Sequence, residues 1–231
     1  MREEKYYEIR WKEFKEKYSS SAVLIEKIGY DEFNKLLANN SPYLYGMRWH
    51  IISLSVGRKS IIKSDDLSGI KHLWPDYIGN GKVLPIMSEK MKDIIESNLK
   101  GTEGIYWIPI TIEAEGEIRP YYILRFKKFI KVLCKEKTEY YYEIPLKAVF
   151  YREKALQYSV IPLQVKNLWD NLGSFYVNSE IKRQLVKADV TGIKYTPVEL
   201  TDGRLTITKV YCKCKINYLI RKIRNVLLRF K

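Results

Sequence analysis

The chain has 231 residues, of which 41 are lysine or arginine and 27 are aspartate or glutamate, so its formal net charge is +14. This length suits one large domain or two small fused halves, each with a hydrophobic core. The positive charge predicts an anionic partner: a nucleic acid, an anionic membrane or the acidic face of a protein. No window approaches the roughly 20 apolar residues that cross a bilayer, and the N-terminus has no apolar segment of the signal-peptide type.

The chain has three cysteines, Cys134, Cys212 and Cys214. They cannot all pair internally, and a one-residue gap suits neither a disulfide nor a zinc knuckle. A reducing, cytoplasmic location is therefore expected.

Residues 1–82 read as an N-terminal α/β segment packed on the rest of the chain. In residues 5–14, Tyr7, Ile9 and Trp11 alternate like a strand, although a helical stripe also fits; a strand is favoured. Residues 22–39 favour a helix with a possible break at Gly29. Residues 47–55 predict a strand, and residues 65–80 predict an irregular loop.

A stretch in the middle of the chain occurs twice, at residues 85–110 and 176–198. The matching positions are a serine before a short amphipathic helix, a glycine before a strand and a proline within that strand. They are Ser88, Gly104 and Pro109 in the first copy, and Ser179, Gly192 and Pro197 in the second. The serines are expected to cap the helices, and each proline is expected at a sheet edge or bulge because it lacks an N–H.

The similarity continues past the prolines, where Glu115-Gly116 and Asp202-Gly203 each precede another alternating run, as in a hairpin. Residues 83–213 thus predict a duplicated core of two helix-loop-strand-turn-strand units, with chance similarity of two common motifs as the alternative. Between the copies, strand formers in residues 121–124, 129–134, 140–144 and 148–151 predict an antiparallel meander. The expected fold class is α+β, mostly antiparallel sheet with short amphipathic helices, in one compact globule.

Residues 214–231 have apolar side chains at helical spacing with six lysines or arginines between them, which predicts a basic amphipathic helix. Such a helix could pack on the protein's own sheet, lie on an anionic membrane surface or hold a partner. All three alternatives are open, and the first is favoured.

Few residues in the sequence form patterns typical of catalysis. The two histidines, His50 and His72, lie in no metal-binding motif, and neither a nucleophile elbow nor a phosphate-binding glycine loop is present. Glu113, Glu115 and Glu117 could share one strand face and bind a cation, but a solvated hairpin tip is the ordinary interpretation. The sequence therefore predicts no catalytic residues, no metal site and no cofactor.

Features typical of binding are stronger, because tyrosine occurs 19 times. Tyrosine and arginine are enriched in interface hot spots, so Tyr140, Tyr141, Tyr142 and Arg152 are the candidate partner-binding residues. For any single tyrosine, packing in the core is the alternative. Aromatic residues interleaved with lysine could also stack nucleobases, which makes a nucleic-acid-binding accessory protein the rival hypothesis.

The repeated pattern resembles a bacterial polymorphic-toxin immunity family, the Imm-eleven type, over about residues 83–200. The residues concerned are a serine-glutamate pair, a glycine with an apolar residue, an aromatic residue, and a proline with Ile or Val. They are Ser88-Glu89, Gly104-Ile105, Trp107 and Pro109-Ile110, repeated as Ser179-Glu180, Gly192-Ile193, Tyr195 and Pro197-Val198. The resemblance implies a small cytoplasmic protein that binds and neutralises a cognate toxin domain by stoichiometric occlusion, without catalysis.

Overall fold

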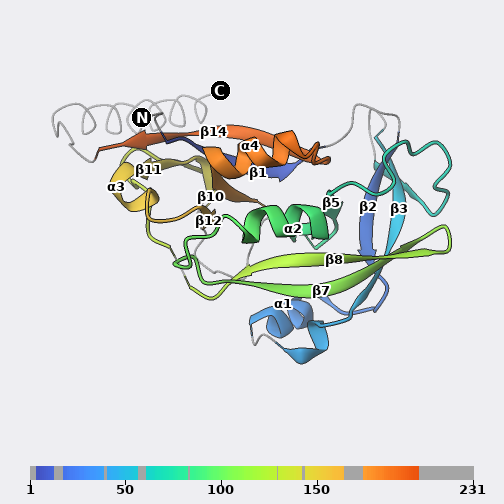
Figure 1. The fold of residues 1–231 in the computed structure, drawn as a ribbon. Coiled ribbons are helices and arrows are strands. Elements are labelled where there is room, and N and C mark those ends of the chain that lie inside the picture. Colours follow the sequence, from blue (N-terminus) through green and yellow to red (C-terminus); the bar gives the residue numbers. More distant parts are fainter. Residues whose placement is uncertain are drawn as a thin grey trace, which may run out of the picture.

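The structure is a computed structural model that describes residues 4–12, 18–38, 41–56, 61–82, 84–128, 130–141, 144–163 and 174–202. It has an α+β fold in which strands dominate, as the sequence predicts (Figure 1). The predicted C-terminal helix at 214–231, Tyr142, Cys212 and Cys214 lie outside the described residues. No helix in the described part of the chain is long and apolar enough to cross a membrane.

The larger sheet has seven strands. In spatial order they are β2 (Tyr18–Leu24), β5 (Tyr77–Asn80), β6 (Ile86–Ser88), β8 (Glu117–Phe126), β7 (Ile105–Ala114), β3 (Arg48–Val56) and β4 (Ile61–Ser64). A further antiparallel pairing of β2 with β3 closes six of these strands into a ring.

The second sheet has five strands. In spatial order they are β11 (Val149–Tyr151), β14 (Ile193–Thr201), β1 (Tyr6–Trp11), β13 (Phe175–Asn178) and β12 (Val160–Pro162). A separate hairpin is formed by β9 (Glu139–Tyr141) and β10 (Ile144–Lys147). The helices are α1 (Tyr30–Ala38), the 3-10 turn η1 (Pro42–Leu44), α2 (Glu89–Glu96), α3 (Arg152–Ala155) and α4 (Ser179–Lys187).

The two helix-strand copies lie in similar strand arrangements, as the predicted duplication requires. The order β5-β6-β8-β7-β3 in the larger sheet matches β12-β13-β1-β14-β11 in the second. We call the first set, with α2, unit 1 and the second set, with α4, unit 2. The registers also agree, since Ser88 lies opposite Tyr121 in unit 1 and Asn178 lies opposite Tyr6 in unit 2.

The two units differ in where along the chain the antiparallel neighbour of β7 or β14 comes from. In unit 1, β8 follows β7 directly through a turn in which Glu115 and Gly116 have positive φ. In unit 2 the equivalent antiparallel neighbour of β14 is β1, from the other end of the chain. Strands from the first 82 residues therefore complete both sheets, and Gly203 of the predicted second turn lies outside the described residues.

The helix caps match only in part. Ser88 caps α2 as expected, since its hydroxyl accepts a hydrogen bond from the N–H of Met91. The prediction for Ser179 is wrong, because the side chain of Asn178 caps α4 by accepting from the N–H of Ile181. Asparagine caps as well as serine does, so Ser88 corresponds to Asn178 and the true match lies one residue away from the serine-to-serine alignment.

The repeated prolines do not lie on edge strands, because β7 and β14 are internal. Pro109 lies instead where pairing with a third strand begins: its carbonyl accepts from Gly46, and β3 pairs with β7 from Thr111 onward. In unit 2, β11 pairs with β14 from Glu199 onward, two residues after Pro197. Each ring nitrogen therefore lies just before the parallel ladder starts, where no N–H is needed.

Three predictions between these elements are wrong. Residues 18–24 form β2, so the predicted helix over 22–39 is confined to the part after Gly29. The predicted loop 65–80 ends in a strand, β5. The predicted meander is not formed, because β8 lies in the larger sheet, β11 pairs in parallel with β14, and residues 130–134 make only an isolated bridge between Leu133 and Phe150.

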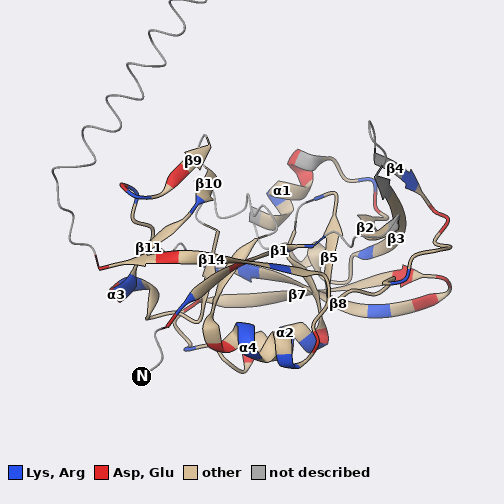
Figure 2. Ribbon diagram, turned by 90° about the horizontal axis from the view of Figure 1, so that it is seen from above, with Lys and Arg blue, Asp and Glu red and all other residues tan. Residues whose placement is uncertain are grey.

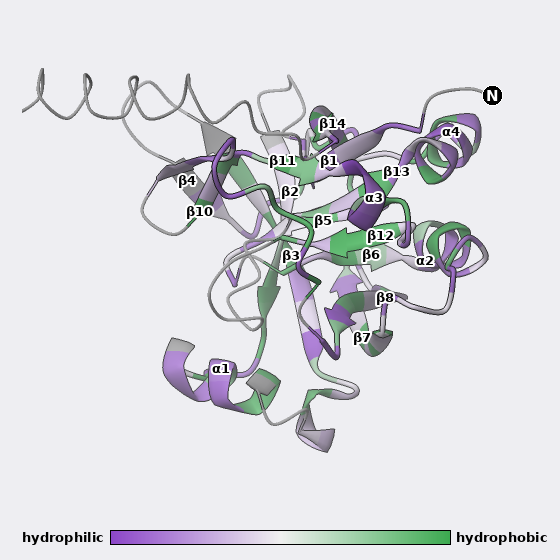
Figure 3. Cartoon of the chain, turned by 90° about the vertical axis from the view of Figure 1, so that its left-hand side faces the viewer, coloured by the Kyte–Doolittle hydropathy of each residue, from purple (hydrophilic) through white to green (hydrophobic). Residues whose placement is uncertain are grey.

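Three clusters of buried side chains form the core. One lies inside the strand ring, where Trp49 and Ile112 are fully buried and α1 contributes Phe33. A second joins the units, because buried residues of α2 and α4 share one cluster with both sheets. A third lies on the opposite face of the second sheet, around Phe150. Figure 3 shows hydrophobic colour on the inner strands and hydrophilic colour on the outward sides of α2 and α4.

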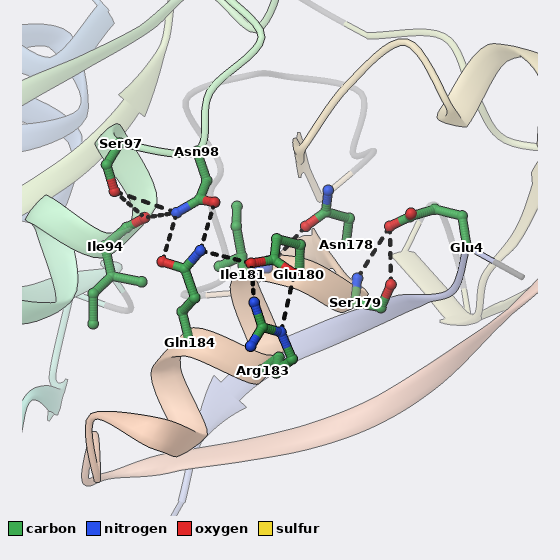
Figure 4. A network of polar contacts seen from close by, with 10 residues as sticks. All are labelled: Glu4, Ile94, Ser97, Asn98, Asn178, Ser179, Glu180, Ile181, Arg183 and Gln184. Atoms are coloured by element: carbon green, nitrogen blue, oxygen red, sulfur yellow. Dashed lines mark hydrogen bonds and ion pairs between the residues drawn. The ribbon is translucent and has the colours of Figure 1, made fainter. Parts of the chain in front are cut away.

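Polar contacts fix α2 against α4 (Figure 4). The side-chain amides of Asn98 and Gln184 donate to each other at 3.0 and 2.9 Å. Lys90 reaches the carbonyl of Asp189 at 3.4 Å. Because each amide is both donor and acceptor in this pair, the side-chain oxygen and nitrogen of both Asn98 and Gln184 have partners.

Candidate partner-binding surface

The β9–β10 hairpin carries two of the predicted partner-binding residues. Tyr141 lies opposite Ile144, and Tyr140 lies opposite Pro145. Adjacent side chains in a strand face opposite sides. Tyr140 and Tyr141 are nevertheless both exposed, by 39% and 60%, whereas Ile144 on the second strand is partly buried and packs on the core cluster around Phe150.

Leu146 on the second strand of the hairpin adds a third exposed side chain, at 60%. The pairing of β10 with β9 shifts register between Pro145 and Lys147. A bulge of this kind redirects a side chain. The sequence interpretation missed Leu146. Side chains alternate between the two faces of a strand, so the residue next to a buried Pro145 could have been expected on the exposed face.

The base of the hairpin is held firmly. Thr138 accepts from the N–H of Val149 at 3.1 Å and donates to its carbonyl at 3.4 Å. The N–H of Cys134 also donates to Val149, at 2.8 Å. Lys137 donates to the hydroxyl of Thr201 at 2.7 Å, which fastens the hairpin to β14. These bonds hold the exposed rings in place, so less entropy is lost when a partner binds them.

A small polar cluster lies beside this base. The Glu136 carboxylate accepts from the hydroxyl of Tyr151 at 3.0 Å and from the thiol of Cys134 at 3.3 Å. Hydrogen bonds with Cys134 and then Glu136 raise the pKa of Tyr151 to about 12. Hydrogen bonds from its own amide, from Cys134 and from Tyr151 lower the pKa of Glu136. At neutral pH the cluster therefore presents a neutral phenol bound to a carboxylate.

Arg152 lies away from the hairpin tip. The hairpin precedes Val149 at one end of β11, and Arg152 follows Tyr151 at the other. The Arg152 Nε donates to the carboxylate of Asp202 at 2.8 Å, and its side chain is 30% exposed. The structure therefore places Tyr140 and Tyr141 on the hairpin but not Arg152, and Tyr142 lies outside the described residues.

The other adjacent tyrosines are divided between core and surface. Tyr6 and Tyr121 are buried, at 0% and 3% exposed, whereas their neighbours Tyr7 and Tyr122 are half-buried. Burial raises the pKa of both Tyr6 and Tyr121. The core-filling alternative is thus correct for one tyrosine of each pair, and Tyr140 and Tyr141 differ from them in both being exposed.

The carboxylates at the β7–β8 turn line an open hollow with His50 and Asp65. Glu115 and Gly116 form the turn itself, and Glu117 is paired with Arg119 at 2.7 Å. No group of three or more His, Cys, Asp or Glu side chains in the described part of the chain has the geometry of a metal site.

Comparisons of the chain with protein families and with curated proteins find no relative. The resemblance to the immunity family therefore stays a prediction that rests on the repeated residues.

Proposed function

We propose that this protein binds a protein partner stoichiometrically through the β9–β10 hairpin and that the partner is a toxin domain, which it neutralises in the cytoplasm. The observation that carries the proposal is the exposure of Tyr140, Tyr141 and Leu146 on one anchored hairpin. Tyrosine supplies large contact area at low entropic cost, and exposed apolar side chains grouped on one element are typical of interaction sites.

Inhibition by occlusion requires a rigid shape and a few anchored aromatic residues. The hairpin supplies both, since Thr138 and Lys137 fix its base to β11 and β14. A specific interface buries about 800 Å² on each partner. A hairpin of this size covers only part of that area, so the toxin domain would contact neighbouring elements as well.

The test is co-expression with the product of the adjacent upstream gene. Wild-type protein should restore growth and form a complex on gel filtration. Replacement of the hairpin side chains (Tyr140→Ala with Tyr141→Ala and Leu146→Ala) should weaken the complex about 100-fold or more, since hot-spot residues contribute at least about 2 kcal/mol each. The free energy of unfolding should change by less than about 1 kcal/mol, because the side chains are exposed.

A matched control exists at η1, where Tyr43 and the C-cap residue Tyr45 are 59% and 46% exposed. The double change Tyr43→Ala with Tyr45→Ala removes the same chemistry from another surface, so it should leave the complex intact. Undiminished toxicity with no complex formed by the wild type would contradict the proposed function. Equal weakening by both sets of substitutions would contradict the assignment to the hairpin.

A further inference from the structure

Both units carry the same cluster of one lysine over two aromatic rings. In unit 1 the ammonium of Lys92, on α2, lies 5.1 Å from the ring centre of Tyr122 and 6.0 Å from that of Trp107. In unit 2 the ammonium of Lys182, on α4, lies 3.7 Å from the ring centre of Tyr7 and 5.4 Å from that of Tyr195.

These residues correspond position by position. Ser88 and Asn178 cap the two helices, so the fourth residue after each cap is Lys92 in α2 and Lys182 in α4. In the same way Tyr122 and Tyr7 occupy equivalent register positions, opposite Met87 and Val177. The two clusters therefore occupy equivalent positions, so the surroundings of Lys92 and Lys182 can be compared directly.

The clusters differ in their carboxylates. In unit 1 Lys92 contacts Glu96 at 2.9 Å and Asp93 at 3.1 Å. The equivalent positions in unit 2 are Val186 and Arg183. Lys182 accordingly makes no hydrogen bond or ion pair with any residue that the structure describes, and its ammonium contacts only the rings.

The exposed residues of the two helices differ in charge as a result, although both helices carry residues of each sign (Figure 2). The exposed charged residues of α2 are Glu89, Lys90, Asp93 and Glu96. The exposed charged residues of α4 are Arg183 and Lys187, and Val186 beside them is 59% exposed. Arg183 is paired with Glu180 at 2.6 Å, so Lys182 and Lys187 are the cations of this face without a carboxylate in the described part of the chain.

We infer that the outer face of α4 binds an acidic segment of a protein partner, whose carboxylate takes on Lys182 the place that Glu96 takes on Lys92. In unit 1 the carboxylate comes from the same helix as the lysine; in unit 2 the partner provides it. The cation lies on aromatic rings that shield it partly from water, which strengthens its attraction for an added carboxylate.

Two observations favour a polypeptide over a nucleic acid. The group that satisfies the equivalent lysine in unit 1 is a carboxylate. Val186 presents an exposed apolar side chain at the centre of the face, which suits contact with apolar side chains more than with a sugar-phosphate backbone. The inference extends the proposed function, because it assigns a second contact, made by charge, to the same class of partner.

The experiment measures peptide binding by full-length variants in which a carboxylate is added at position 186 of unit 2 or removed from α2 of unit 1. The probe is a fluorescein-labelled peptide of alternating glutamate and leucine, and a labelled single-stranded oligonucleotide serves for comparison. Val186→Glu places a carboxylate four residues after Lys182, as in unit 1, and should weaken peptide binding about fivefold, because exposed ion pairs have modest energies. Lys182→Gln should weaken it to a similar extent.

Two controls separate this site from general charge. Val186→Gln keeps the size without the charge and should bind as the wild type does. Ile118→Glu, at an exposed position in β8 close to the β7–β8 turn, makes the same change in net charge and should weaken binding less than twofold. The double change Asp93→Arg with Glu96→Val copies the unit 2 face onto unit 1 and should add a second peptide site.

Equal effects of Val186→Glu and Ile118→Glu would overturn the inference, since they would show attraction by net charge alone. An effect of Val186→Glu on the oligonucleotide but not on the peptide would also overturn it, and would assign the face to nucleic acid. These outcomes are distinct from failure of the proposed function, which is read from growth rescue and from the hairpin substitutions.

Discussion

Unit 1 and unit 2 place the same strands, helix and aromatic residues in the same registers, yet they differ in what each position contributes. Unit 1 is continuous in sequence from β3 to β8, and its helix carries its own carboxylates. Unit 2 borrows β1 from the N-terminus and leaves cations on the surface of α4. The comparison teaches that the repeated residues maintain the fold, whereas the residues that differ between the units are the candidates for binding.

The largest expected effect comes from the repeated glycines. Gly192 has φ +79°, and a Cβ at this position would lie far too close to the carbonyl oxygen of Tyr77. Gly104 has φ +67°, but its Cβ would meet only the flexible side chain of Lys128 at 3.4 Å. Gly192→Ala should therefore cost about 4 kcal/mol and Gly104→Ala about 1 kcal/mol, from backbone strain with and without a steric clash.

Chemical denaturation of the two variants measures this difference. If the two substitutions lower the free energy of unfolding equally, the close approach of Gly192 to the carbonyl oxygen of Tyr77 does not add to the cost of a side chain at that position.

A smaller effect is expected at Asp76, whose carboxylate joins the units. It accepts from the hydroxyl of Ser88 at 2.7 Å and from the N–H of Thr191 at 2.9 Å, and it contacts the ammonium of Lys90 at 2.9 Å. Burial alone would raise the pKa of Asp76, but the hydrogen bonds from Thr191, Ser88 and Lys90 hold it below its ordinary value. Asp76→Asn should cost about 2–3 kcal/mol, as expected when a hydrogen-bonded charge is removed.

The pH dependence follows from the direction of that shift. Because the pKa of Asp76 is lower in the folded protein than in the unfolded chain, its contribution is present above the unfolded pKa and is lost as pH falls through the folded pKa. The free energies of unfolding of the wild type and Asp76→Asn should differ at neutral pH and converge as the pH falls through the folded pKa of Asp76. Asp66→Asn is the control, because the pKa of Asp66 is also lowered but the side chain is fully exposed.

The smallest expected effect concerns the equivalent buried tyrosines. The hydroxyl of Tyr121 donates to the carbonyl of Pro75 at 2.9 Å, and that of Tyr6 lies 2.7 Å from the equivalent carbonyl, of Tyr158. Tyr6 also lies 2.6 Å from the carbonyl of Ala155. Tyr6→Phe and Tyr121→Phe should each cost about 1 kcal/mol; the single hydroxyl proton of Tyr6 is shared between two carbonyls, and that of Ala155 keeps the N–H of Tyr158 as a donor. A large cost at one site with none at the other, measured by thermal unfolding, would show that the two positions are not equivalent in energy.

The sequence was informative about the candidate site only in part. Adjacent tyrosines in strands were predicted to include exposed rings, and among the described pairs only Tyr140 and Tyr141 are both exposed. Arg152 was chosen by residue type, and its ion pair with Asp202 depends on the ends of two distant strands meeting. The difference between Lys92 and Lys182 required the register of α4, which Asn178 shifts by one residue from the serine-based alignment.

What the sequence determined by itself are the local elements: the α+β class, the two capped amphipathic helices, the glycines before β7 and β14, and the presence of a repeat. Periodicity and turn residues act over a few neighbours, so the chain encodes them directly. Only the tertiary structure decided that β1 completes unit 2, that the prolines lie beside parallel ladders and that the β9–β10 hairpin stands apart from both sheets. Strand partners are chosen by burial of whole faces against distant segments, and residue spacing along the chain carries no record of that choice.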